Sequence, residues 1–173
     1  VSGQGSLAET HPNCAGVVGS NGGQPAIRSL VDEADLIFYI GCRAGSVTTE
    51  RWRSPKAGTT VVHMDNDPAV IGACYQTKAA MVCDARLGLE ALILELGAVF
   101  GKNGTVRVLA AKTEKWKAFA PLAISNKMPI KPERVLADLA KHLPDDAVVC
   151  ADPGTPCPYF SAWFEWRKPG RYF

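Results

Sequence analysis

Two groups of residues in this sequence have the types and spacing needed to bind a charged ligand. The first is the glycine-rich loop Gly19-Ser20-Asn21-Gly22-Gly23, which precedes a predicted helix at residues 25–34. Clustered glycines let a ligand approach the backbone, and a helix N-terminus favours phosphate. A plain flexible turn explains the same glycines, because a single loop of this kind is a weak signal. If the loop holds a nucleotide, Gly19, Asn21 and Gly22 are expected to line its site.

The second group consists of charged residues at the ends of three predicted strands. Arg43 follows an apolar run at residues 36–40, and Asp65 follows a β-branched run at 60–64. Asp84 follows a shorter run at 79–82. In open parallel sheets, ligands bind outside the carboxyl ends of the strands. The two acids would suit a ribose and Arg43 a phosphate, although Asp84 is also a good N-cap for a helix over 85–96.

A third candidate is the loop Asp152-Pro153-Gly154-Thr155, which follows a predicted buried strand at 147–152 and precedes a predicted helix at 159–166. Gly154 would let a ligand approach the backbone, and the Thr155 hydroxyl can donate to a phosphate oxygen. The next residue, Pro156, has no N–H to donate. We expect Asp152, Gly154 and Thr155 to contact a ligand; a proline-stiffened turn without a ligand is the alternative.

Signatures of catalysis and metal binding are missing from the sequence. It contains no GxSxG, P-loop or HExxH motif, and its six cysteines form no CxxC pair. His63, Asp65 and Asp67 alternate at a strand end, but a site with oxygen ligands usually needs more donors. We therefore predict no catalytic and no metal-binding residue in this chain. The cysteines are interpreted as reduced and structural, which favours a cytoplasmic location.

Composition and periodicity predict the fold class. The 173 residues are 47% hydrophobic and 21% charged, with a net charge of +2. Strand and helix patterns alternate over the first two-thirds, which predicts an α/β fold with a parallel sheet and helices on both faces. The low net charge gives no indication of nucleic-acid or membrane-surface binding. No apolar run reaches the roughly 18–20 residues of a membrane span.

The chain is predicted to contain parts of two domains. A first domain would cover residues 1–98, and a linker with Pro121 and Pro129 would cover 99–130. A new α/β unit would begin at 131 and continue to 173, with a helix over 133–143 followed by the strand at 147–152.

Four segments occur in an order and spacing that resemble a known family: GSLAETHP (5–12), residues 19–43, VVHMDNDPAVIG (61–72) and CDARLGLEAL (83–92). They resemble the central domain of thiamine-diphosphate-dependent enzymes, in particular the acetolactate synthase large subunit. Residues 131–173 look like the opening of the diphosphate-binding domain of these enzymes. The resemblance implies a Rossmann-like (DHS-like) parallel sheet with helices on both faces, followed by the first α/β unit of a second domain.

The resemblance also implies a reaction. A whole protein of this family would decarboxylate a pyruvate-like 2-keto acid and transfer the acyl carbanion equivalent to an acceptor. It would use thiamine diphosphate and Mg²⁺, the metal being held through residues outside this chain, and would form a homodimer or homotetramer. The pyrimidine-binding domain with the family's activating Glu would also lie outside these residues, so the chain alone is expected to be inactive.

Departures from the family pattern leave open which nucleotide, if any, binds at the glycine-rich loop and the strand ends. Ser20-Asn21-Gly22-Gly23 stands where acetolactate synthases typically show Met-His-Gly-Thr, and residues 43–47 replace an RFDDR-like stretch. Both positions contact FAD in the family, so the alternatives for this site are FAD, ADP or no nucleotide. Thr155 and Pro156 stand where the family usually has Gln and His. Two alternatives to an enzyme remain: a non-catalytic nucleotide-binding domain and a structural module.

Overall fold

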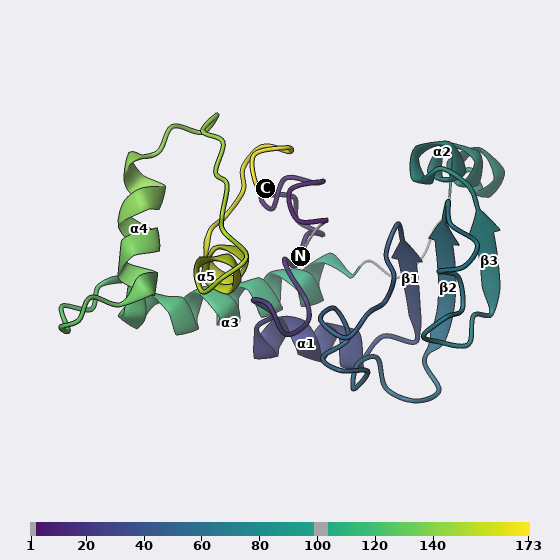
Figure 1. The fold of residues 1–173 in the computed structure, drawn as a ribbon, viewed down its shortest axis with the longest axis horizontal. Coiled ribbons are helices and arrows are strands. Elements are labelled where there is room, and N and C mark those ends of the chain that lie inside the picture. Colours follow the sequence, from purple (N-terminus) through teal and green to yellow (C-terminus); the bar gives the residue numbers. More distant parts are fainter. Residues whose placement is uncertain (1–2, 99–103) are drawn as a thin grey trace. The chain divides into compact units, whose positions relative to one another are not determined.

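The computed structural model describes residues 3–98 and 104–173. The helices are α1 (Pro25–Asp32), α2 (Ala85–Leu96), α3 (Thr105–Ala123), α4 (Pro132–His142) and α5 (Pro156–Trp163). The strands are β1 (Leu36–Ile40), β2 (Thr60–Asp65) and β3 (Ala79–Val82) (Figure 1). The chain divides into two compact units: Val31–Asn103, here the sheet unit, and Val1–Leu30 with Gly104–Phe173, here the helical unit.

The sheet unit contains the predicted parallel sheet. Its strands lie in the order β1-β2-β3, and both neighbouring pairs are parallel. Leu36 pairs with Thr60, and Val62 pairs with Ala79. The α/β fold class and the three strand positions are confirmed. Runs of apolar and β-branched residues form these strands because such side chains pack well on a pleated surface.

Helix α2 covers one face of this sheet. A Cβ atom at Gly88 would lie 2.6 Å from Cys83 Sγ and 2.8 Å from Met64 Sδ, so a side chain there would have to displace the ends of these two side chains. The helix begins after Asp84, whose Oδ1 accepts hydrogen bonds from the backbone N–H groups of Arg86 (3.0 Å) and Leu87 (3.1 Å). The N-cap predicted at Asp84 is therefore present, and it fixes the start of α2 directly after β3.

The other face of the sheet carries an aromatic cluster and the loop between β1 and β2. Tyr39 and His63 face each other across β1 and β2, with ring centroids 5.8 Å apart, and Tyr75 stacks on Tyr39 at 6.1 Å. The buried His63 donates from Nε2 to the carbonyl of Cys42 at 2.9 Å. Burial raises the pKa of the Tyr39 hydroxyl well above its ordinary value. These contacts hold the start of the loop against β2.

The helical unit is built around a cluster of aromatic side chains. Leu136 from α4 meets Phe164, Trp166 and Tyr172 from the end of the chain. The Trp166 ring stacks on Tyr172 with centroids 4.6 Å apart and lies 4.4 Å from Phe164. Large aromatic surfaces supply much of the burial energy available to so small a unit.

The strand predicted over 147–152 is only partly formed. Val149 makes an isolated parallel bridge with Tyr172, with Val149 N donating to Arg171 O at 2.9 Å and Phe173 N donating to Val149 O at 3.0 Å. Val148 is 55% exposed, which contradicts the expectation of a buried strand. A strand buried on both faces needs neighbouring strands, and among the described residues only 171–173 pair with this segment. The predicted helix at 159–166 instead runs from Pro156 to Trp163, because proline suits the first turn of a helix.

The predicted domain boundaries at residues 98 and 130 stay predictions. The linker was expected to start at residue 99, outside the described residues. Helix α3 lies within that predicted linker and packs against α4 in the helical unit.

Two buried charges connect the N-terminal segment to α3. Glu9 and Lys115 are only 5% and 6% exposed. Gln4 Nε2 donates to Glu9 Oε1 at 2.8 Å, and Lys112 Nζ donates to the Glu9 carbonyl at 2.6 Å. Burial raises the pKa of Glu9 and lowers that of Lys115, while the electrostatic attraction between the two groups opposes both changes.

The glycine-rich loop packs against α5. Gly22 has a φ of +104°, and a Cβ atom there would lie 2.7 Å from Ser161 Cβ and 3.0 Å from both Ala162 N and Pro158 O. A Cβ at Gly23 would lie 2.4 Å from Gly19 O. The loop therefore needs glycine twice, once to meet a helix and once to close its own turn.

None of the helices within residues 3–98 and 104–173 has the length and hydropathy needed to cross a membrane.

We predict that Gly22→Ala destabilises the protein by about 1–3 kcal/mol, because it forces a side chain into a packed contact and into a left-handed backbone conformation. Urea unfolding followed by circular dichroism would measure this loss. Gly3→Ala is the matched control, because a Cβ atom there meets nothing within 4 Å. The control should change stability by no more than about 0.5 kcal/mol. Equal effects of the two substitutions would contradict the packing assignment.

We predict that Glu9→Gln changes how stability depends on pH. The folded-state pKa of Glu9 lies above the ordinary value of 4.5. Between those two values the folded state holds more protons than the unfolded state, so stability falls as pH rises through this window. Glu9→Gln should flatten that fall, whereas Glu95→Gln, an exposed position on α2, should not. Urea midpoints collected at successive pH values test this, and parallel curves for wild type and Glu9→Gln would refute it.

Candidate functional site

The helical unit contains a β-α-β connection in which a candidate ligand loop lies between the first β segment and the helix. The chain runs from Val149 through the loop 152–155 and α5 to Tyr172, which pairs in parallel with Val149. The loop therefore leaves the carboxyl end of the first segment, the end at which parallel sheets bind their ligands. The sequence predicted this placement for Asp152, Gly154 and Thr155, but no ligand contact is tested by the structure.

A hydrogen-bonded turn shapes this loop. The Gly154 backbone N–H donates to Asp152 Oδ2 at 3.2 Å, and Cys157 N donates to Gly154 O at 3.3 Å. Thr155 stands at the N-cap position of α5 in a helical conformation, and its side chain makes no capping hydrogen bond. The exposed Thr155 hydroxyl is thus available to an incoming acceptor.

The N-terminus of α5 supplies few hydrogen-bond donors to a ligand. Pro156 and Pro158 have no N–H, and the N–H of Cys157 already donates to Gly154. A phosphate group at this position would depend on the Thr155 hydroxyl and the Gly154 backbone. This donor set is smaller than that of an ordinary helix N-terminus, which presents several free N–H groups.

A hollow of about 730 Å³ lies beside the loop. Pro153 and Cys157 line one part, Tyr172 and Gly170 another, and the N-terminal residues 4–6 a third. Tyr172 donates weakly to the Cys157 carbonyl at 3.4 Å, and burial raises the pKa of its hydroxyl. The side-chain oxygen of Gln4, Oε1, is buried without a donor among the described residues. The hollow has room for a cofactor-sized group and offers it polar contacts.

Sequence reasoning missed Gln4, Cys157 and Tyr172 as lining residues of this hollow. The pairing of Tyr172 with Val149, together with the hydrogen bond from Ala151 N to Phe173 O, brings the two ends of this segment together.

The glycine-rich loop belongs to the same unit as the loop 152–155, but α5 occupies the space next to Gly22. Gly19 is buried with a φ of +92°, and Asn21 is half-buried. These contacts explain the glycines by helix packing. A role of Gly19, Asn21 and Gly22 in nucleotide binding stays a prediction.

The remaining predicted site residues lie in the sheet unit. Because β1, β2 and β3 are parallel, their ends bring Arg43, Asp65 and Asp84 to one edge of the sheet. Asp65 Oδ1 accepts from Asp67 N at 3.0 Å, and Asp84 caps α2. Both acids thus have structural roles, while Arg43 is exposed. Nothing tests whether the three residues contact a ligand.

The described residues contain no group of three or more His, Cys, Asp or Glu side chains arranged to hold a metal ion.

Comparison with known proteins identifies the family. Residues 1–92 match the family model described as the central domain of thiamine pyrophosphate enzymes. The chain is 27% identical over 180 residues to a probable acetolactate synthase large subunit of Methanococcus aeolicus, covering 96% of this chain and 30% of that protein. It is 30% identical over 175 residues to the corresponding protein of Methanocaldococcus jannaschii, covering 96% of this chain and 29% of that protein.

A bacterial relative gives the same result. Acetolactate synthase isozyme 3 large subunit of Escherichia coli is 28% identical over 173 residues, covering 98% of this chain and 30% of that protein. The chain thus spans a little under a third of the length of these curated relatives. Together with the parallel sheet and the capped helix after β3, the family match over 1–92 shows that this chain belongs to the thiamine pyrophosphate enzymes, in their acetolactate-synthase-like branch.

Proposed function

We propose that this chain is part of a thiamine-diphosphate-dependent enzyme that decarboxylates a 2-keto acid and transfers the acyl carbanion equivalent to a second carbonyl compound. The observation that carries the proposal is the exposed Thr155 hydroxyl, which makes no capping hydrogen bond and lies in the loop at the carboxyl end of the segment that pairs with Tyr172. The similarity to acetolactate synthase large subunits supports the reaction class.

The donor set of the loop fits one end of a diphosphate. The Thr155 Oγ1–H can donate to a phosphate oxygen, and the Gly154 backbone is exposed, with only the Asp152 carboxylate within 3.1 Å of a Cβ position there. With few N–H groups at the start of α5, most of the phosphate charge must be balanced elsewhere. We propose that Mg²⁺, held through residues outside this chain, balances that charge.

The chemistry that thiamine diphosphate supplies when bound is an electron sink for the carbanion that a decarboxylation leaves. The residues of this chain position one end of the cofactor. Asp152 shapes the turn by accepting from Gly154 N, and this turn presents the Thr155 hydroxyl outward. The proposal includes a homo-oligomer of two or four chains acting in the cytoplasm.

A second candidate function is nucleotide binding by the sheet unit, without catalysis. The gathering of Arg43, Asp65 and Asp84 at one sheet edge favours it. The nucleotide would be FAD or ADP, and release of either on denaturing the purified protein would support this reading. Protein that releases neither would leave the sheet unit a structural role.

We predict that Thr155→Val in the full-length protein weakens binding of thiamine diphosphate in the presence of Mg²⁺. The loss should be about 0.5–1.5 kcal/mol, and up to about 3 kcal/mol if the phosphate charge strengthens the hydrogen bond. Calorimetric titration measures this loss. Thr113→Val on α3 is the matched control, because its hydroxyl only donates to Leu109 O in its own helix.

Two outcomes test separately whether Thr155 belongs to the cofactor site and whether the protein catalyses the proposed reaction. Unchanged affinity in Thr155→Val would remove Thr155 from the site while leaving the family chemistry intact. Wild-type protein that binds the cofactor but releases no CO₂ from pyruvate or other 2-keto acids would contradict the proposed reaction.

A further inference from the structure

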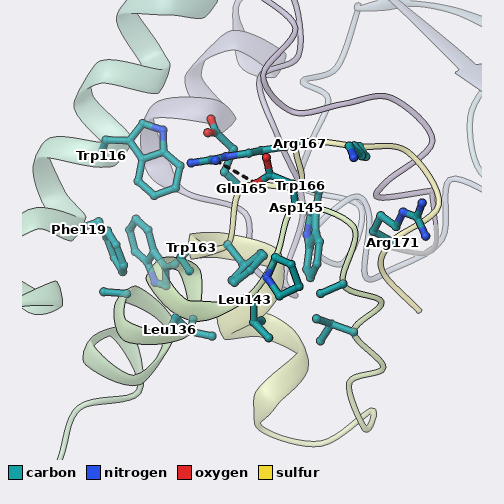
Figure 2. Close-up of a pocket in the computed structure, with 17 residues that line it drawn as sticks. Trp116, Phe119, Leu136, Leu143, Asp145, Trp163, Glu165, Trp166, Arg167 and Arg171 are labelled. Carbon is teal, nitrogen blue, oxygen red and sulfur yellow. Dashed lines mark hydrogen bonds and ion pairs between the residues drawn. The ribbon is translucent and has the colours of Figure 1, made fainter.

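A second cavity, of about 300 Å³, lies within the helical unit between α3, α4 and the segment that follows α5 (Figure 2). It shares no lining residue with the hollow beside the loop 152–155. Its volume lies at the lower end of the range for small-molecule sites. Neither the family chemistry nor the proposed diphosphate contact uses this cavity.

Aromatic rings form much of the cavity wall. Phe119 stacks on Trp163, with centroids 5.1 Å apart and an interplanar angle of 19°, and Trp116 meets the edge of Phe119 at 5.6 Å. Figure 2 shows Trp116, Phe119 and Trp163 on one side of the cavity and Trp166 on the other. Such walls favour a flat ligand, because a planar ring can stack against them.

Two buried donors in the cavity lining have no acceptor within the described part of the chain. One is the indole Nε1–H of Trp166, whose side chain is 3% exposed, and the other is Nε of Arg171. An unpaired buried donor has lost its hydrogen bonds to water without gaining others, so buried donors are normally satisfied. Both groups donate only, which means that a matching ligand must carry acceptor atoms.

The charges around the cavity favour an anion. Three basic residues, Arg167, Lys168 and Arg171, line it together with two acids, Asp145 and Glu165. Asp145 is occupied by Arg167, with 3.0 Å between Oδ1 and Nη1. Glu165 attracts the buried Lys115, which opposes the lowering of the Lys115 pKa by burial, but Lys115 also faces Glu9.

With three basic and two acidic residues, the lining of the cavity carries one net positive charge. We propose that this cavity binds a small planar aromatic carboxylate, with its ring against the Phe119 and Trp163 wall and its carboxylate accepting from the Trp166 indole N–H and the Arg171 side chain. Stacking supplies shape selection, and the two donors with the basic rim supply selection for charge. The site is separate from the thiamine diphosphate contact and serves a second small molecule.

Titration of the purified full-length protein with 1-naphthoate tests the proposal. Binding is followed by calorimetry and by quenching of tryptophan fluorescence, since three of the four tryptophans line the cavity. The neutral amide 1-naphthamide and the non-aromatic cyclohexanecarboxylate serve as matched probes. Each should bind about 10-fold or more weakly than 1-naphthoate, because one lacks the charge and the other the flat ring.

Three variants locate the binding. Ala140→Trp places a large side chain in the cavity from an exposed position on α4, and it should abolish binding without disturbing the core. Trp166→Phe keeps a ring but removes the indole donor, and Arg171→Gln removes the charge. Each should weaken 1-naphthoate binding about 10-fold. Arg86→Gln, an exposed arginine of the sheet unit, is the control and should bind like wild type.

The outcomes are decisive in either direction. Binding of 1-naphthoate that Ala140→Trp removes, with 1-naphthamide much weaker, supports the proposal. No binding by the wild type would overturn it, as would equal binding of naphthoate and naphthamide. Unchanged binding in Ala140→Trp would overturn it as well, and this variant keeps the test valid if Trp166→Phe fails to fold.

Discussion

The position of α5 depends on the lack of a side chain at Gly22. Any Cβ at that position would come within 3.0 Å of Ala162 N and closer still to Ser161 Cβ, so the loop and the helix can meet only through glycine. On the other side of α5, Phe160 lies near the Trp166 and Tyr172 rings. Because α5 is packed on both sides, its position determines where the loop 152–155 ends. The position of the exposed Thr155 hydroxyl follows from this. The candidate diphosphate contact thus relies on packing between segments distant in the sequence.

Packing between segments that are distant in the sequence also explains which features the sequence could predict and which it could not. Strands β1, β2 and β3 were predictable because each is an apolar run whose pattern is local, and Asp84 was predictable as an N-cap because capping involves only its next three residues. The incomplete strand around Val149 was not, because strand formation depends on partners that no local pattern reveals. The glycine-rich loop was ambiguous for a similar reason: a phosphate and a packed helix both require glycine there. The buried pair Glu9 and Lys115 carries no periodic signal at all.

The chain belongs to the thiamine pyrophosphate enzymes, but its candidate site has an unusual set of hydrogen-bond donors. A proline at each of two positions in the first turn of α5 removes donors that a phosphate could otherwise use. Thr155 offers one hydroxyl in their place, so this chain would contribute orientation more than charge neutralisation. Such a small contribution to charge neutralisation agrees with the proposal that a cation held elsewhere balances the charge of the diphosphate. In the sheet unit, Asp65 accepts from the backbone of the loop after β2 and Asp84 caps α2, so both acids have structural roles whether or not a nucleotide binds there.

The most direct test of this account is an experimental structure of the full-length protein with thiamine diphosphate and Mg²⁺ bound. The account predicts a diphosphate oxygen within hydrogen-bonding distance of Thr155 Oγ1, about 2.5–3.0 Å, with α5 still packed on Gly22. A bound cofactor whose diphosphate lies away from residues 152–155 would contradict it.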